Sequence, residues 1–162
     1  MQLVDKTVWW ADDACCLIDQ TRLPGVIEVV RCTRLAEVVS AIKTMQVRGA
    51  PAIGITAAYG MVVALNEAEA TGASASLETL RAAKATLDAA RPTAVNLAWA
   101  TARVLGAVEQ ASGDAGALKA VALREAEAIR DEDEAMCRAI GAHGAALFAK
   151  RTNVLTHCNA GG

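Results

Sequence analysis

Aromatic residues are scarce in this sequence. They make up 3% of the 162 residues, whereas hydrophobic residues of all kinds make up 54%, and much of that share is alanine. Sheets packed face to face depend on bulky side chains, so this composition excludes a β-sandwich and favours closely packed helices. The length suits one ordinary domain with its own core and is short for two.

A strong charge of either sign is also lacking. The net charge is −2, and no cluster of lysine and arginine offers a footprint for nucleic acid or a membrane surface. The longest apolar stretch, 50–65, is shorter than a membrane span and rich in glycine and alanine. Residues 1–6 lack the basic start and apolar core of a signal peptide. We expect a cytoplasmic protein that binds neither nucleic acid nor membranes.

Paired cysteines are missing as well. The five cysteines are odd in number and form neither a CxxC pair nor a metal-ligand spacing: Cys15, Cys16, Cys32, Cys137 and Cys158. In a cytoplasmic chain most such residues are reduced, small and buried. No metal site is expected.

The segment 47–54 is the part around which the chain is organised. It reads Val-Arg-Gly-Ala-Pro-Ala-Ile-Gly and runs into an apolar stretch of small residues. Arg48 supplies a fork-shaped cation, Gly49 permits close approach of the backbone, and Pro51 suits the start of a helix whose free N–H groups attract anions. These features indicate a small anion site, for phosphate. The same residues also turn a corner into a buried helix, and local chemistry alone favours that second interpretation.

The chain in order predicts a small antiparallel sheet followed by helices. Three short strands are expected at 3–10, 14–19 and 26–32, because β-branched residues alternate there between turn signals. Helical spacing and cap residues then predict helices at 33–45 (cap Thr33), 51–68, 76 to before 91 (cap Ser76), 93–108 (cap Thr93) and a long amphipathic segment to 150.

Two clusters allow a functional and a structural interpretation. Trp9 and Trp10 could stack on a ligand, but neighbours on a strand point to opposite faces, so one core and one interface residue is favoured. The acidic run within 130–134 could bind a metal, but consecutive carboxylates spread around a helix. A solvated helix face is therefore the favoured interpretation.

The last residues predict the beginning of another motif. Residues 153–158 suggest a short buried strand that ends in Cys158 and passes into Asn-Ala-Gly-Gly. An α/β sheet presents a nucleophile or an acid/base group at such a place, where a helix would follow. Here the sequence ends within the motif.

Three separated segments together resemble one enzyme family. They are 47–54, the segment 91–97 (Arg-Pro-Thr-Ala-Val-Asn-Leu) and the segment 155–161 (Leu-Thr-His-Cys-Asn-Ala-Gly). In order and spacing they resemble the signatures of the 5-methylthioribose-1-phosphate isomerases, which belong with the ribose-1,5-bisphosphate isomerases and the regulatory subunits of translation initiation factor 2B. The resemblance covers the first half of the family's length.

The resemblance implies an α+β fold in two parts. Residues 1–150 would form the N-terminal domain, mostly helical with a small antiparallel sheet and a long connecting helix. Residues 151–162 would be the first strand and turn of a truncated Rossmann-like α/β domain. A complete protein of this family would be a homodimer, and this chain by itself would be inactive.

The resemblance also implies a reaction and its residues. Arg48, Gly49, Ala50 and Arg91 would bind the substrate, a sugar phosphate, and Cys158 would be one half of an acid/base pair. The reaction would turn 5-methylthioribose 1-phosphate into 5-methylthioribulose 1-phosphate in methionine salvage, without a metal or an organic cofactor. A ribose-1,5-bisphosphate isomerase and a non-catalytic regulatory subunit remain as alternatives.

Overall fold

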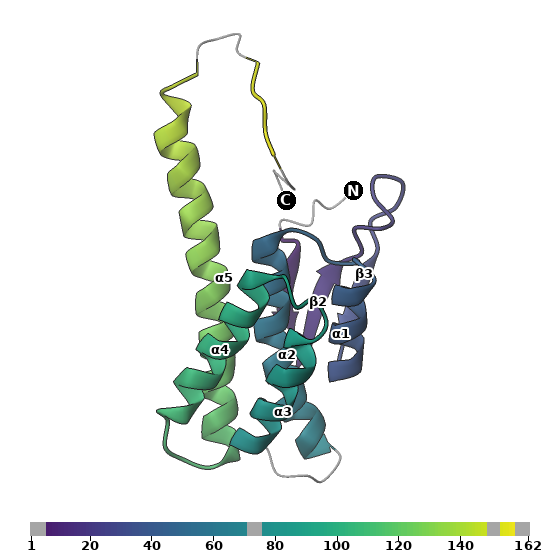
Figure 1. Cartoon of the computed structure of the whole chain (residues 1–162), viewed down its shortest axis with the longest axis vertical. Helices are drawn as coiled ribbons and strands as arrows, with labels where there is room; N and C mark the ends of the chain where they lie inside the picture. Colours follow the sequence, from purple (N-terminus) through teal and green to yellow (C-terminus); the bar gives the residue numbers. More distant parts are fainter. Residues whose placement is uncertain (1–5, 71–75, 149–152, 158–162) are drawn as a thin grey trace.

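A computed structural model gives the fold and describes residues 6–70, 76–148 and 153–157. Within these residues a small sheet precedes a group of helices (Figure 1). The elements are β1 (Val8–Ala11), β2 (Ala14–Ile18), β3 (Val29–Cys32), α1 (Leu35–Lys43), α2 (Ala50–Ala70), α3 (Leu77–Asp88), α4 (Val95–Glu109) and α5 (Ala115–Ala145). The expected mostly helical domain with a small sheet is confirmed.

The sheet is antiparallel throughout, in the order β1-β2-β3. Asp12 and Asp13 join β1 to β2 with φ values of 44° and 59°, the left-handed conformation that two-residue hairpin turns require. The strands are shorter than expected: β1 begins at Val8, and β3 begins only at Val29. Before Val29 the chain forms a turn around Pro24, and residues 26–28, where β-branched residues predicted strand, have no regular structure.

Helix α2 lies at the centre of the molecule. Every residue from Ile53 to Leu65 is buried, so the helix is covered on all its sides. The sheet covers one of them, where the Trp10 ring lies 5.6 Å from the ring of Tyr59. Trp10 is thus the core member of the tryptophan pair. None of the described helices, α2 included, has the length and hydropathy that crossing a bilayer needs.

Helices α3 and α4 run in opposite directions. Arg81 near the start of α3 pairs with Glu109 at the end of α4, with 2.7 Å between nitrogen and oxygen. At the other end Thr101 donates a 2.8 Å hydrogen bond to Asp88. In each contact the C-terminal end of one helix meets the N-terminal half of the other, which is the antiparallel arrangement.

Helix α5 runs antiparallel to α2. Arg130 donates a 3.0 Å hydrogen bond to the hydroxyl of Tyr59, and Lys119 pairs with Glu69 at 2.6 Å. The order of these contacts is reversed along the two helices. Alternating helix directions place the starts of α2 and α4 at the same end of the molecule (Figure 1).

One arginine on α4 joins that helix to α5. The Arg103 guanidinium contacts Glu125 at 2.6 Å and Glu132 at 2.7 Å. Other carboxylates of the acidic run pair locally, Asp131 with Arg130 and Glu134 with Arg138. Apart from the half-buried Asp133, the carboxylates of the run are exposed and ion-paired, as the favoured interpretation of a solvated helix face predicted.

The caps of α1 and α3 differ in how far the sequence predicted them. Ser76 caps α3 as expected and accepts a 3.3 Å hydrogen bond from the N–H of Thr79. For α1 the expected cap Thr33 is wrong by one residue, because Arg34 holds the extended cap position. The Glu37 carboxylate accepts from the N–H groups of Thr33 and Arg34 at 2.9 and 3.1 Å. This is the acidic half of a capping box, and the Glu67 carboxylate accepts from the N–H of Leu35, the first residue of the helix, at 2.8 Å.

The apolar stripe of α5 is buried only in its first half. Ala122 and Ile129 lie in the core, whereas Met136 and Ile140 are 59% and 65% exposed. The helix ends at Ala145, earlier than the expected end near 150. Figure 1 shows its second half rising beyond the other helices. The apolar side chains of α5 therefore continue beyond the helices against which its first half packs.

The expected strand at 153–158 is not found. Residues 153–157 have no regular structure and are exposed, with Leu155 98% accessible. A strand forms only against a neighbouring strand, and β1, β2 and β3, the strands of the described residues, pair with one another instead. Cys158 and the glycine-rich turn after it lie outside the described residues.

The sheet cysteines are buried free thiols, as expected. Cys15 lies directly opposite Cys32 in the β2–β3 register, and both are fully buried, while Cys16 is 4% exposed. Burial raises the pKa of the Cys15 thiol and raises that of Cys32 to about 11. Cys137 on α5 departs from the expectation because it is exposed.

We expect thiol labelling to separate these cysteines. Iodoacetamide at neutral pH should modify Cys137 in the native chain and leave Cys15, Cys16 and Cys32 unmodified, because buried thiols with raised pKa values form little thiolate. Peptide mass spectrometry identifies the sites, with the chain unfolded in urea as the control in which all four react. Native labelling of Cys15 or Cys32 as fast as Cys137 would contradict the packing of the sheet.

A second prediction concerns the contact between α2 and α4. A Cβ added at Gly54 would lie 3.0 Å from the carbonyl oxygen of Asn96, whereas one added at Gly106 meets nothing within 4 Å. We expect Gly54→Ala to lower the free energy of unfolding by about 1–2 kcal/mol through overpacking. Gly106→Ala should raise it by about 0.5–1 kcal/mol through helix propensity. Urea unfolding measures both, and equal effects of the two substitutions would show that this contact is loose.

Candidate functional site

The loop between α1 and α2 begins with a tight helix end. Met45 has a φ of 62°, and the N–H groups of Met45 and Gln46 return to the carbonyls of Ile42 and Ala41 at 3.4 and 3.0 Å. This pair of bonds is a Schellman motif, which usually has glycine at the left-handed position. Val47 follows and is fully buried, which anchors the chain before Arg48.

The start of α2 carries the residues from which the sequence predicted an anion site. Gly49 has a φ of 94°, a conformation that favours glycine, and its carbonyl accepts from the N–H of Ile53 at 2.9 Å. The helix begins at Ala50, so Pro51 is its second residue and not its first. Within the described residues the N–H of Gly49 has no acceptor, and Ala50 is exposed. Unpaired donors at the start of a 21-residue helix attract negative charge.

Arg91 lies in the loop between α3 and α4. Its carbonyl accepts from the N–H of Ala94 at 2.9 Å, which closes a turn before α4. The expected cap Thr93 is wrong by one residue, since Ala94 takes the cap position without a side-chain bond. Because alanine has no hydroxyl, the cap residue of α4 offers no side-chain acceptor to the first N–H groups of the helix.

The two arginines share an electrostatic property. Across the described parts of the chain, no carboxylate lies within ion-pair distance of the Arg48 or Arg91 guanidinium, although Arg81, Arg103 and Arg138 are all paired. Arg48 is exposed and Arg91 is half-buried. Both guanidiniums therefore keep their donors for a ligand.

Packing between α2 and α4 brings the two loops to one end of the molecule. The absence of a side chain at Gly54 lets the second turn of α2 lie directly against the backbone of Asn96, in the first turn of α4. The loops that carry Arg48, Gly49 and Arg91 thus lead into neighbouring helix starts, while Cys158 lies outside the residues described.

Three residues that hold the Arg48 loop were not predicted as part of the site. Gln20 donates from its side chain to the Arg48 carbonyl at 3.3 Å, and Asp19 accepts from the side chain of Gln46 at 2.9 Å. Asp19 also accepts from the hydroxyl and the N–H of Thr21 at 2.6 and 2.9 Å. An Asp two residues before a Thr at a strand end is a turn signal that could have revealed the aspartate, but not its distant partner.

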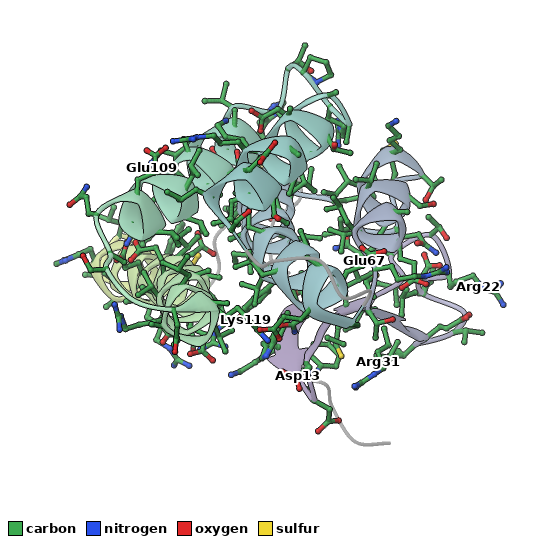
Figure 2. The ribbon with its side chains drawn as sticks, turned by 90° about the horizontal axis from the view of Figure 1, so that it is seen from below. Asp13, Arg22, Arg31, Glu67, Glu109 and Lys119 are labelled. Carbon is green, nitrogen blue, oxygen red and sulfur yellow. The ribbon has the colours of Figure 1, made fainter. Side chains whose placement is uncertain are left out.

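A hollow of about 690 Å³ lies away from these residues. It is lined by Asp13, Glu67 and Lys119 among others, at the opposite end of α2 (Figure 2). Three of its charged side chains are already engaged: Lys119 pairs with Glu69, and Glu67 accepts from the N–H of Leu35 at 2.8 Å. We therefore place the candidate site at the helix starts and not in this hollow.

The fold and the paired helix starts define a helical domain with a candidate anion site. Residues 46–162 match the initiation factor 2 subunit family, and the chain belongs to that family. A relative named methylthioribose-1-phosphate isomerase, from Herpetosiphon aurantiacus, is 60% identical over 97% of this chain and 44% of its own length. The chain thus spans under half the length of this curated relative.

Two solved structures resemble the fold. One is the delta subunit of the translation initiation factor eIF-2B from A. fulgidus, with a TM-score of 0.79 and 37% identity over 88% of this chain and 42% of that one. The other is 5-methylthioribose 1-phosphate isomerase from Pyrococcus horikoshii OT3, with a TM-score of 0.70 and 36% identity over 78% of this chain and 36% of that one. An enzyme and a translation factor subunit thus share this fold.

Proposed function

We propose that this chain is the phosphate-binding part of a sugar-phosphate isomerase that converts 5-methylthioribose 1-phosphate to 5-methylthioribulose 1-phosphate in methionine salvage. The observation that carries the proposal is the close approach of α2 and α4 at Gly54 and Asn96, near the helix starts that follow Arg48 and Arg91. The 60% identity to the Herpetosiphon isomerase supports the choice of reaction. We further propose a cytoplasmic homodimer for the longer protein, because the exposed apolar stripe of α5 offers a surface to cover.

The substrate's phosphate would be held by two kinds of donor. The guanidiniums of Arg48 and Arg91 would form charge-assisted hydrogen bonds with its oxygens, and Arg48 has no competing carboxylate in the described structure. The N–H groups of Gly49 and Ala50 would approach it from the start of α2, where the helix dipole favours negative charge. The missing side chain of Gly49 leaves room for that approach.

The chemistry requires ring opening and a shift of hydrogen. A phosphate on the anomeric oxygen blocks the ring opening available to a free sugar, so the enzyme must assist it. Hydrogen then moves from C2 to C1, the C2 hydroxyl becomes a carbonyl, and the reaction needs no external oxidant or reductant. The hydrogen can move as a proton through an enediolate or directly as a hydride, and either route conserves atoms and electrons.

Cys158 is our proposed acid/base group. A thiol can give or accept a proton in this reaction if its surroundings set its pKa near the working pH. The same surroundings must exclude water, and a longer chain would have to supply the walls that do so. We therefore expect the 162-residue chain alone to lack isomerase activity.

A non-catalytic role is the second candidate, favoured by the fold shared with the eIF-2B delta subunit. A subunit of that kind would keep the helical domain but have no use for Cys158. A ribose-1,5-bisphosphate isomerase is the nearest enzymatic alternative, and it differs in the group at C5 of the sugar. Activity measurements separate all three.

The deciding experiment compares two proteins in an isomerase assay. One is this chain, and the other, called the extended protein below, continues it after Gly162 with the C-terminal part of the Herpetosiphon relative. We expect turnover of 5-methylthioribose 1-phosphate by the extended protein alone. Faster turnover of ribose 1,5-bisphosphate would identify that sugar as the substrate instead. No turnover of either sugar phosphate would favour the regulatory role.

Cys158→Ser in the extended protein is the matched control for the chemistry. It should abolish most turnover and leave the affinity for substrate nearly unchanged, because a hydroxyl replaces the thiol without altering the phosphate contacts. Turnover close to that of the unsubstituted protein would reject the role of Cys158.

A further prediction concerns the two arginines. Arg48→Ala or Arg91→Ala in the extended protein should each remove about 2 kcal/mol of phosphate binding and raise KM roughly 30-fold. Arg48→Lys should recover only part of the loss, because an ammonium lacks the fork of the guanidinium. Arg124→Ala on the exposed face of α5 is the control of equal charge. Steady-state kinetics measure KM, and equal values for all three alanine variants would place the phosphate elsewhere.

A further inference from the structure

The segment after β2 holds the loop before α2 by three hydrogen bonds. The N–H of Gln20 donates to the Gln46 carbonyl at 2.8 Å, and the Gln20 side chain donates to the Arg48 carbonyl at 3.3 Å. The Gln46 side chain donates to Asp19 at 2.9 Å. Segments 26 or more positions apart in the sequence are thus joined at the main chain that carries Arg48.

Asp19 is an unusually constrained carboxylate. It is only 6% exposed, and its two oxygens accept three hydrogen bonds, two from Thr21 and one from Gln46. These bonds, the Thr21 hydroxyl first among them, lower the pKa of Asp19. A carboxylate that stays ionised can only accept, so it fixes the Gln46 amide with its NH₂ group toward Asp19.

The bond to the Arg48 carbonyl also sets the direction of a neighbouring donor. A peptide group is planar and trans, so its C=O and the following N–H point in opposite directions. Gln20 holds the Arg48 oxygen and thereby orients the N–H of Gly49, which has no acceptor within the described residues. Gly49 and Met45, with φ values of 94° and 62°, bracket a loop that needs such an external support.

We propose that Asp19, Gln20 and Gln46 form a clamp that positions the Arg48–Gly49 peptide for the phosphate of the substrate. The inference rests on the proposed function, since a clamp on a loop that binds no phosphate would have only a structural role. The three residues touch no substrate atom. They act through the direction of the Gly49 N–H and the place from which the Arg48 side chain departs.

Exchanging donor and acceptor tests the clamp in the extended protein. Gln46→Glu sets two carboxylates face to face and should weaken phosphate binding about tenfold, seen in the Ki of inorganic phosphate as a competitive inhibitor and in KM, with kcat changed far less. Adding Asp19→Asn restores one donor facing one acceptor and should bring Ki back to within about threefold of the starting value. Gln20→Ala should also raise the Ki of phosphate, and adding Asp19→Asn to this variant should not restore it.

Asp12→Asn is the control, because this carboxylate lies in the β1–β2 turn and pairs with Arg31, away from the site. Thermal unfolding of each variant monitors the fold, and the double variant and Gln20→Ala keep the test valid if Gln46→Glu unfolds. An unchanged Ki in the folded clamp variants, or a Ki that stays raised in the double variant, overturns the clamp alone. An unsubstituted extended protein with neither turnover nor phosphate inhibition overturns the proposed function and the clamp together.

Discussion

The burial of α2 on every side is the constraint on which this fold depends. A helix without a polar face must be covered all round, and the sheet, α1, α3, α4 and α5 all pack around it. Small residues make this possible, since Gly54 and Gly60 admit a backbone and large side chains at 3.0 Å from where a Cβ would lie. The same closeness at Gly54 brings the second turn of α2 against the first turn of α4.

The candidate site follows from that packing. Two helices that begin side by side present their unpaired N–H groups at one end, and each is preceded by an arginine without a carboxylate partner in the described structure. The field of the helix starts and the two guanidiniums act in the same direction, toward an anion. Asp19, although acidic, turns its charge inward to Thr21 and Gln46 and so supports the loop without opposing that field.

Local patterns in the sequence predicted what local forces decide. The apolar run of α2, the Ser76 cap and the three antiparallel strands all appear in the structure. Thr33 and Thr93 failed as caps because the N–H groups of a helix start can be satisfied by other means, in the first case by the Glu67 carboxylate, which accepts from the N–H of Leu35. Such choices depend on competition between neighbours, and residue type alone does not resolve it.

Contacts between distant segments could not be predicted in the same way. The bond from Gln20 to Arg48 spans 28 positions, and no periodicity indicates it. At the strand expected before Cys158 a local pattern was present but the distant contact was not: a strand-like segment without a partner strand stays irregular. The apolar stripe of α5 was predicted correctly, but its exposed second half could be recognised only once the other helices were in place.

The most direct test is a crystal structure of the extended protein with 5-methylthioribulose 1-phosphate bound. We predict that the phosphate lies at the starts of α2 and α4, within hydrogen-bond distance of the Gly49 or Ala50 N–H and of the Arg48 and Arg91 guanidiniums. A phosphate bound elsewhere, with both arginines turned to solvent, would contradict the account.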